Sequence, residues 1–184
     1  VAFIGLGNMG GPMASNLIKA GFNIVCFDLQ ANLTQALVAE GASAAATAVD
    51  AVAGADFVIS MLPSGAIVES LYIYDTKLLD HIAKDCLVID CSTVAPENSR
   101  ALASAAAARD IRAIDAPVSG GVAAAAAGTL AFMCGGTKDA VEDAKKVLGF
   151  MGANVFRAGD AGAGQVAKVC NNIMSFTNLV IGLE

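Results

Sequence analysis

Short apolar runs alternate with helical patterns along most of this 184-residue chain. The runs VAFIG, DFVISML and CLVIDC are apolar at successive positions, as strands buried on both faces are. Similar runs are NIVCFD, IRAIDAPV and TLAFMCGG, with a weaker candidate at residues 153–156. Helical patterns occupy residues 9–20, 33–40, 48–53, 96–109 and 138–148, the last after a capping Thr137. This strict alternation predicts a doubly wound, mostly parallel α/β sheet.

Composition and charge narrow the class of protein. Hydrophobic residues make up 56% and charged residues 15%, which predicts an ordered chain, and no apolar run reaches the length of a membrane span. The net charge of −6 without a basic cluster argues against a nucleic-acid partner. The only histidine, His81, lies in LLDHIAKD, which predicts a surface helix. With five cysteines and no CxxC pair, we expect no metal site, and buried thiols in a reducing compartment, either cytoplasm or mitochondrial matrix.

A glycine-rich loop, G-x-G-x-x-G at Gly5, Gly7 and Gly10, stands between the first strand and the first helix. In such a loop the first glycine permits a tight turn, the second lets the backbone approach a pyrophosphate, and the third lets helix and strand pack closely. The helix N-terminus adds amide donors and partial positive charge. A glycine turn can be purely structural, but between this strand and this helix it predicts a Rossmann-type dinucleotide site.

The second strand ends in Asp28, where a carboxylate can accept hydrogen bonds from both hydroxyls of an adenosine ribose. It would repel a 2′-phosphate, and no arginine follows it, since the next residues are Leu29 and Gln30. The cofactor predicted is therefore NAD and not NADP. A methyltransferase also pairs a glycine loop with an acid after the second strand, so that alternative stays open on these two features.

Three further loops follow strands and should meet at the same edge of the sheet, where ligands bind. They are SMLPSG, DCSTVAPE and DAPVSGG, which contain Leu62, Pro63, Thr93, Ser119, Gly120 and Gly121. A Ser-Gly-Gly turn at a helix start offers a hydroxyl and unhindered amides, which suit a substrate carboxylate. An ordinary turn with a capping serine has the same sequence.

The segment GQVAKVCNN, residues 164–172, places a lysine among apolar residues. On a helix Lys168, Asn171 and Asn172 share one face. Apolar surroundings lower the pKa of a lysine from about 10 toward neutrality, and such an amine can exchange a proton with an alcohol. The alternative is a lysine that extends to the surface.

Five segments together resemble the β-hydroxyacid dehydrogenase family: FIGLGNMGGPMASNLIKAG, ISMLPSG, IDCSTVAPE, DAPVSGGV with AGTLAFMCGG, and GAGQVAKVCNN. The resemblance implies hydride transfer between NAD and a small 3-hydroxy acid. It implies that Lys168 is the catalytic acid and base, with Asn172 beside it, and that the Ser119–Gly121 turn binds the substrate. The residues assigned to the cofactor are Gly5, Leu6, Gly7, Asn8, Met9, Gly10, Asp28, Leu29, Gln30, Leu62, Pro63 and Thr93.

The resemblance also implies a longer protein, in which a long helix leads to an all-helical C-terminal domain. Residues 1–160 are then the NAD-binding domain and residues 161–184, apolar on nearly all sides, the start of that helix. Because the chain begins inside an apolar strand pattern and ends inside a helical one, we expect a piece of such a protein. We also expect a small-molecule substrate, no membrane partner, and a homo-oligomer formed through the helical domain. The alternatives are a reductase of a short semialdehyde and a non-catalytic NAD-binding module; a methyltransferase gives Lys168 no role.

Overall fold

The computed structural model describes residues 1–182, and within them nine strands form one sheet. The strands are β1 (Ala2–Ile4), β2 (Val25–Phe27), β3 (Ser43–Ala44), β4 (Phe57–Ser60), β5 (Leu87–Asp90), β6 (Arg112–Asp115), β7 (Val118–Ser119), β8 (Leu130–Gly135) and β9 (Gly152–Gly159). Their order is β3-β2-β1-β4-β5-β6-β8-β7, with β9 paired to β8. The first six positions have the strand order of a Rossmann dinucleotide-binding sheet.

The sheet is parallel from β3 to β6 and changes direction at β8. Strand β8 runs antiparallel to β6 and β7, and β9 runs parallel to β8. The carboxyl ends of β1, β4, β5 and β6 therefore lie on one edge, which is where the predicted site loops begin. The prediction of a mostly parallel, doubly wound sheet is confirmed.

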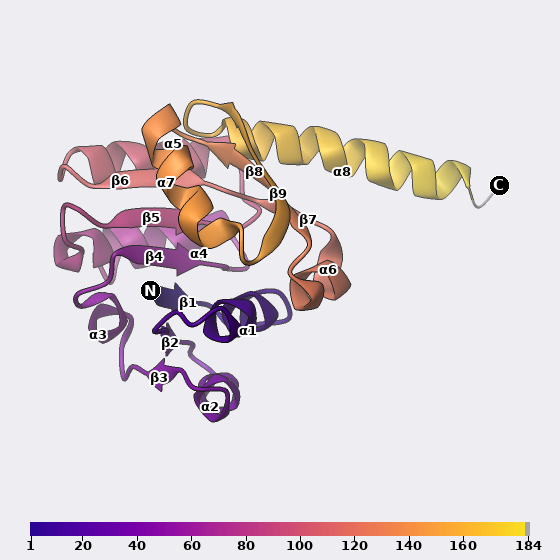
Figure 1. Ribbon diagram of the computed structural model, residues 1–184. Coiled ribbons are helices and arrows are strands. Elements are labelled where there is room, and N and C mark those ends of the chain that lie inside the picture. Colours follow the sequence, from indigo (N-terminus) through magenta and orange to yellow (C-terminus); the bar gives the residue numbers. More distant parts are fainter. Residues whose placement is uncertain (183–184) are drawn as a thin grey trace.

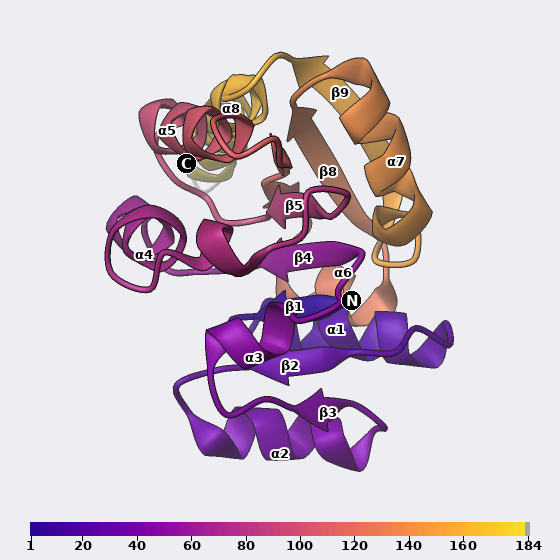
Figure 2. The same cartoon turned by 90° about the vertical axis from the view of Figure 1, so that its left-hand side faces the viewer.

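Helices cover both faces of the sheet. They are α1 (Gly10–Lys19), α2 (Ala31–Ala39), α3 (Ala48–Val52), α4 (Gly65–Glu69), α5 (Pro96–Ala107), α6 (Gly121–Ala127), α7 (Lys138–Leu148) and α8 (Ala163–Ile181), with a π-helical turn η1 (Ser70–Tyr74) and a 3₁₀ turn η2 (Leu78–His81). Helices α1 and α7 pack on one face, and α3, α4 and α5 on the other (Figure 2).

The side chains of successive residues in the central strands pack into two different hydrophobic cores, one on each face of the sheet. In β5, Leu87 and Ile89 pack with α1 and α7, while Val88 packs with α3 and α5. All three side chains are fully buried. Burial on both faces is the reason why these strands consist of continuous apolar residues rather than alternating ones.

The segment around His81 differs from the predicted surface helix. It forms only the single 3₁₀ turn η2, and Leu78 and Leu79 are buried in the core below α3 and α5. Lys77, just before the turn, has a left-handed backbone with φ of 51°, which prevents continuation from η1 into a longer helix. His81 itself is exposed, as expected.

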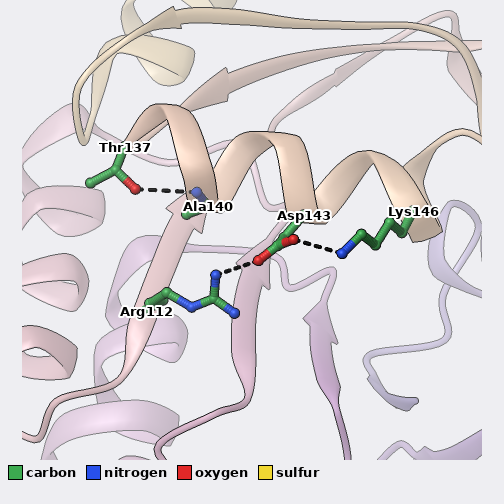
Figure 3. A network of polar contacts seen from close by, with 5 residues as sticks. All are labelled: Arg112, Thr137, Ala140, Asp143 and Lys146. Carbon is green, nitrogen blue, oxygen red and sulfur yellow. Dashed lines mark hydrogen bonds and ion pairs between the residues drawn. The ribbon is translucent and has the colours of Figure 1, made fainter.

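Side-chain hydrogen bonds stabilise helix α7 at its start and at its middle (Figure 3). The Thr137 hydroxyl oxygen accepts a hydrogen bond from the Ala140 amide at 3.2 Å, so the predicted cap is confirmed. The Asp143 carboxylate accepts hydrogen bonds from Arg112 on β6 and from Lys146 at 2.8 Å. The bond from Arg112, followed by that from Lys146, lowers the pKa of Asp143 to about 2.

The lowered pKa of Asp143 predicts a pH effect. Since the folded-state pKa lies below the value of about 3.9 for a free aspartate, the ion pairs stabilise the fold above about pH 4, and this stabilisation is lost as the pH falls toward 2. Arg112→Met should raise the pKa of Asp143 toward the ordinary value, whereas Lys138→Met at the exposed start of α7 should not. Carbon-13 NMR titration of the carboxyl group measures both variants. An unchanged pKa in Arg112→Met would contradict this assignment.

Helix α8 begins on the edge of the sheet and then projects away from the domain (Figure 1). Its start is buried at Gly164 and Gln165, but apolar side chains further along are exposed: Val166, Val169, Ile173, Met174, Phe176 and Ile181. The long helix is as predicted, although within residues 1–182 only its start is packed; Leu183 and Glu184 lie outside the described residues. Among those described, none of the helices has the length and hydropathy needed to cross a bilayer.

Candidate dinucleotide site and lysine helix

The three glycines of the loop between β1 and α1 have different surroundings. Gly5 has a φ of 87°, and a Cβ atom there would overlap the carbonyl oxygen of Met61. A Cβ atom at Gly10 would overlap the carbonyl oxygen of Gly5. A Cβ atom at Gly7 would meet no protein atom within 4 Å. The first and third glycines are therefore required by the fold, while Gly7 leaves space for something outside the protein.

Asp28 joins the second strand to this loop. Its Oδ2 atom accepts a hydrogen bond from the Leu6 amide at 2.7 Å, and its Oδ1 atom accepts one from the Gln30 amide at 2.8 Å. Each carboxylate oxygen can accept a second hydrogen bond, so the half-buried side chain can still bind ribose hydroxyls. The bond to Leu6, by which Asp28 also holds the glycine loop in place, has no signal in the sequence.

A groove of about 720 Å³ opens beside the loop, within the size range of small-molecule sites. Ten of the twelve residues assigned to the cofactor line it: Gly5, Gly7, Asn8, Met9, Gly10, Asp28, Leu29, Gln30, Leu62 and Pro63. Neither of the other two residues lines the groove: Leu6 is buried and Thr93 is exposed. The groove is also lined by Thr47, Ser70 and Thr76, which the sequence did not predict.

The Ser-Gly-Gly turn follows β7 and begins α6. Gly120 and Gly121 have φ values of 134° and 69°, which an L-residue rarely adopts, so both positions require glycine. Ser119 is half-buried, and its Oγ atom accepts a hydrogen bond from Nδ2 of Asn171 on α8 at 3.2 Å. The structure therefore brings the predicted substrate turn against the helix that carries Lys168.

Lys168 lies on the same half-buried face of α8 as Asn171 and Asn172. Burial lowers the pKa of its ammonium group from the ordinary value, in the direction that the sequence analysis predicted. The predicted cause, desolvation of the amine, is also confirmed, although the nearby Val166 and Val169 are exposed in the described part of the chain. Of the two amides, Asn171 makes the contact with Ser119, and the role at the substrate assigned to Asn172 stays a prediction.

The start of α8 is held by Asp115, at the end of β6. The Asp115 carboxylate accepts hydrogen bonds from the Gly162 amide at 2.7 Å and from the Gln165 amide at 3.0 Å. These amides are among those a helix leaves unpaired at its N-terminus. A Cβ atom at Gly164 would overlap the carbonyl oxygen of Met133, so only glycine allows the helix to approach β8 this closely. The position of Lys168 is thus set by the sheet.

Residues 1–159 match the protein family described as the NAD binding domain of 6-phosphogluconate dehydrogenase. The chain belongs to this family. Its cofactor is NAD, as the sequence predicted, and the strand order is that of a Rossmann-type fold. Which residues of the NAD-binding domain touch the cofactor is not decided by the match, so their assignment stays a prediction.

Curated relatives of the NAD-binding domain carry two names. The NAD-dependent L-serine dehydrogenase of Pseudomonas aeruginosa is 58% identical over 172 residues, and the 3-hydroxyisobutyrate dehydrogenase of the same organism is 55% identical over 174 residues. The matches cover 94% and 95% of this chain but only 58% of the length of each relative. These matches confirm the resemblance to the β-hydroxyacid dehydrogenases.

A solved structure has the same fold. The Mycobacterium tuberculosis 3-hydroxyisobutyrate dehydrogenase with L-serine matches with a TM-score of 0.90 at 43% identity. The match covers 94% of this chain and 58% of that one. The fold of the described residues is therefore that of the corresponding part of this dehydrogenase.

Proposed function

We propose that the full-length gene product oxidises a small 3-hydroxy acid with NAD, and that 3-hydroxyisobutyrate, an intermediate of valine catabolism, is the substrate. The product would be methylmalonate semialdehyde. The observation that carries the proposal is the position of Lys168, whose pKa is lowered by burial and whose helix face reaches the Ser-Gly-Gly turn through Asn171. A lysine with a lowered pKa, on a helix whose neighbouring Asn171 contacts the turn proposed to bind the carboxylate, suits proton transfer at a hydroxy acid.

The reaction moves one proton and one hydride. The amides and hydroxyl of the Ser119–Gly121 turn hold the substrate carboxylate. The neutral amine of Lys168 removes the proton of the 3-hydroxyl group, and the carbon–oxygen bond becomes a carbonyl as the hydride leaves carbon 3. NAD, when bound, supplies the hydride acceptor. Asn172 orients the lysine or the substrate by hydrogen bonds. For the reverse reaction the protonated lysine returns its proton to the carbonyl.

L-Serine is the second candidate substrate. The 58% identical relative is named for it, and the solved 43% identical relative contains it. L-Serine and 3-hydroxyisobutyrate share a hydroxymethyl group and a carboxylate on one carbon, and differ in an amino group in place of a methyl group. The turn and the lysine would act on the shared part, so these residues fit both substrates.

A panel of 3-hydroxyisobutyrate, L-serine and glycerate, each with NAD and with NADP, tests the proposal on the full-length gene product. We expect the highest kcat/KM with 3-hydroxyisobutyrate and NAD. Preference for glycerate would favour the alternative of a tartronate semialdehyde reductase. Preference for NADP would contradict the role of Asp28. Binding of NAD without turnover of any hydroxy acid would favour the non-catalytic module.

The exposed apolar side chains of α8 support the proposed domain organisation. We propose that residues 1–160 form the NAD-binding domain, and that α8 starts a long helix leading to an all-helical domain that covers this face. The matched share of 58% of the relatives' length fits such a domain. We place the homo-oligomer contact in that domain. The five free cysteines, four of them buried, fit a reducing compartment, for which we propose the cytoplasm or the mitochondrial matrix.

A further inference from the structure

Gln165 is a fully buried polar residue in the first turn of α8, and both ends of its side chain are hydrogen-bonded. Its Nε2 atom donates to the carbonyl oxygen of Ser92 at 2.8 Å. Its Oε1 atom accepts from the amide of Val94 at 3.1 Å. The side chain therefore bridges the two residues on either side of Thr93, in the loop after β5.

The backbone of Gln165 is held from another direction. Its amide donates to the Asp115 carboxylate at 3.0 Å, at the end of β6. Strands β5 and β6 are neighbours, with Asp90 opposite Asp115 at their carboxyl ends. Gln165 is thus attached to two adjacent strand ends at once, through its side chain to one and through its backbone to the other. This arrangement prevents both rotation and sliding of the first turn of α8.

Ser92 extends this attachment to the cofactor groove. Its Oγ atom accepts a hydrogen bond from the Leu62 amide at 2.8 Å and donates one to the buried carboxylate of Asp90 at 2.6 Å. Leu62 lines the groove. Ser92 therefore connects the wall of the groove with the helix that carries the lysine, because its Oγ atom accepts from Leu62 and its carbonyl oxygen accepts from Gln165.

We propose that Gln165 is a positioning residue, which sets the position of Lys168 relative to the groove wall at Leu62, one of the residues assigned to the cofactor. Lys168 follows three residues later, on the next turn of the same helix. The inference rests on the proposed function, because the distance that Gln165 would control matters only if the lysine exchanges a proton with the substrate. A displacement of about 1 Å at a reacting group can reduce a rate by about a hundredfold.

Gln165→Met tests the inference, since methionine has a similar size but cannot form either hydrogen bond. We expect the single-turnover rate of NADH formation in the full-length gene product to fall by about ten- to a hundredfold. The Kd for NAD should change by less than about threefold, because Gln165 does not line the groove. The deuterium isotope effect on kcat, with substrate labelled at carbon 3, should equal or exceed the wild-type value, since the hydride step becomes slower.

Thr137→Ala is the matched control. It removes the cap of α7, which lies outside the groove, and should lower Tm without changing the rate of hydride transfer. Gln165→Glu is a second variant: protonated glutamic acid can donate to Ser92 and accept from Val94, as glutamine does. Its hydride-transfer rate relative to wild type should therefore recover as the pH falls.

The outcomes separate the two proposals. If Gln165→Met lowers Tm as Thr137→Ala does and transfers hydride at the wild-type rate, Gln165 serves stability only and the positioning role is wrong. If the wild-type protein oxidises no hydroxy acid, the proposed function is wrong and the positioning role with it.

Discussion

We expect Lys168→Ala to lower kcat of the full-length gene product by at least about a hundredfold, the size expected for loss of a general base. The Kd for NAD should stay unchanged, because Lys168 does not line the groove beside the glycine loop. Lys168→Arg is expected to be as inactive as the alanine variant. An arginine keeps the positive charge, but it does not lose its proton in proteins and cannot act as a base.

Steady-state kinetics and calorimetric titration with NAD measure these two quantities. In wild type, oxidation should slow as the pH falls, because protonation of Lys168 removes the base, and Lys168→Ala should lack this limb of the pH profile. Lys138→Ala, at the exposed start of α7, is the control lysine and should keep wild-type kcat. Turnover by Lys168→Ala within twofold of wild type would remove the lysine from the mechanism.

The second large effect is expected from alanine substitutions at Gly7 and Gly10, which should differ in their effect on stability. Gly7→Ala should keep the Tm of the protein without ligand, since the added methyl group meets no protein atom within 4 Å. It should weaken NAD binding by about tenfold or more, about 1.4 kcal/mol, because the methyl group occupies the space that the pyrophosphate needs. Gly10→Ala should lose both stability and NAD binding, since its methyl group overlaps the Gly5 carbonyl oxygen. Overpacking of this kind costs about 1–3 kcal/mol.

Thermal unfolding with and without NAD measures both effects, because a ligand that binds only the folded state raises Tm. The two variants serve as controls for each other, since each adds one methyl group to the same loop. If Gly7→Ala bound NAD as tightly as wild type, the pyrophosphate would have to lie elsewhere than over Gly7.

The fold and the end of the groove formed by the glycine loop could be predicted because their signals are local. Strands buried on both faces, such as β5, are continuous apolar runs, and the glycine loop and Asp28 lie within one strand–helix–strand unit. The groove wall at Thr47, Ser70 and Thr76 has no such signal. The positions of Ser70 and Thr76 depend on the short helix α4 and on the π-helical turn η1, which are too short to show a helical period. Thr47 caps the start of α3, and a cap marks a helix start but not a groove.

The contacts around α8, the helix that carries Lys168, could not be predicted, because they join distant parts of the chain. Periodicity places Asn171 and Asn172 on one face, but which of them reaches Ser119 depends on the rotation of α8 about its axis. That rotation is set by Asp115, which lies 50 residues before Gln165, and by Ser92, which lies 73 residues before it. No pattern within the helix contains this information.

The Asp28 carboxylate accepts hydrogen bonds from the amides of Leu6 and Gln30, and these bonds limit any redesign of coenzyme preference. Replacing this residue to admit a phosphorylated ribose also removes the acceptor for the Leu6 amide, so we expect the same change to loosen the glycine loop. A successful exchange toward NADP would have to retain a side-chain oxygen at position 28 and introduce the compensating cation at a neighbouring position, such as Leu29 or Gln30.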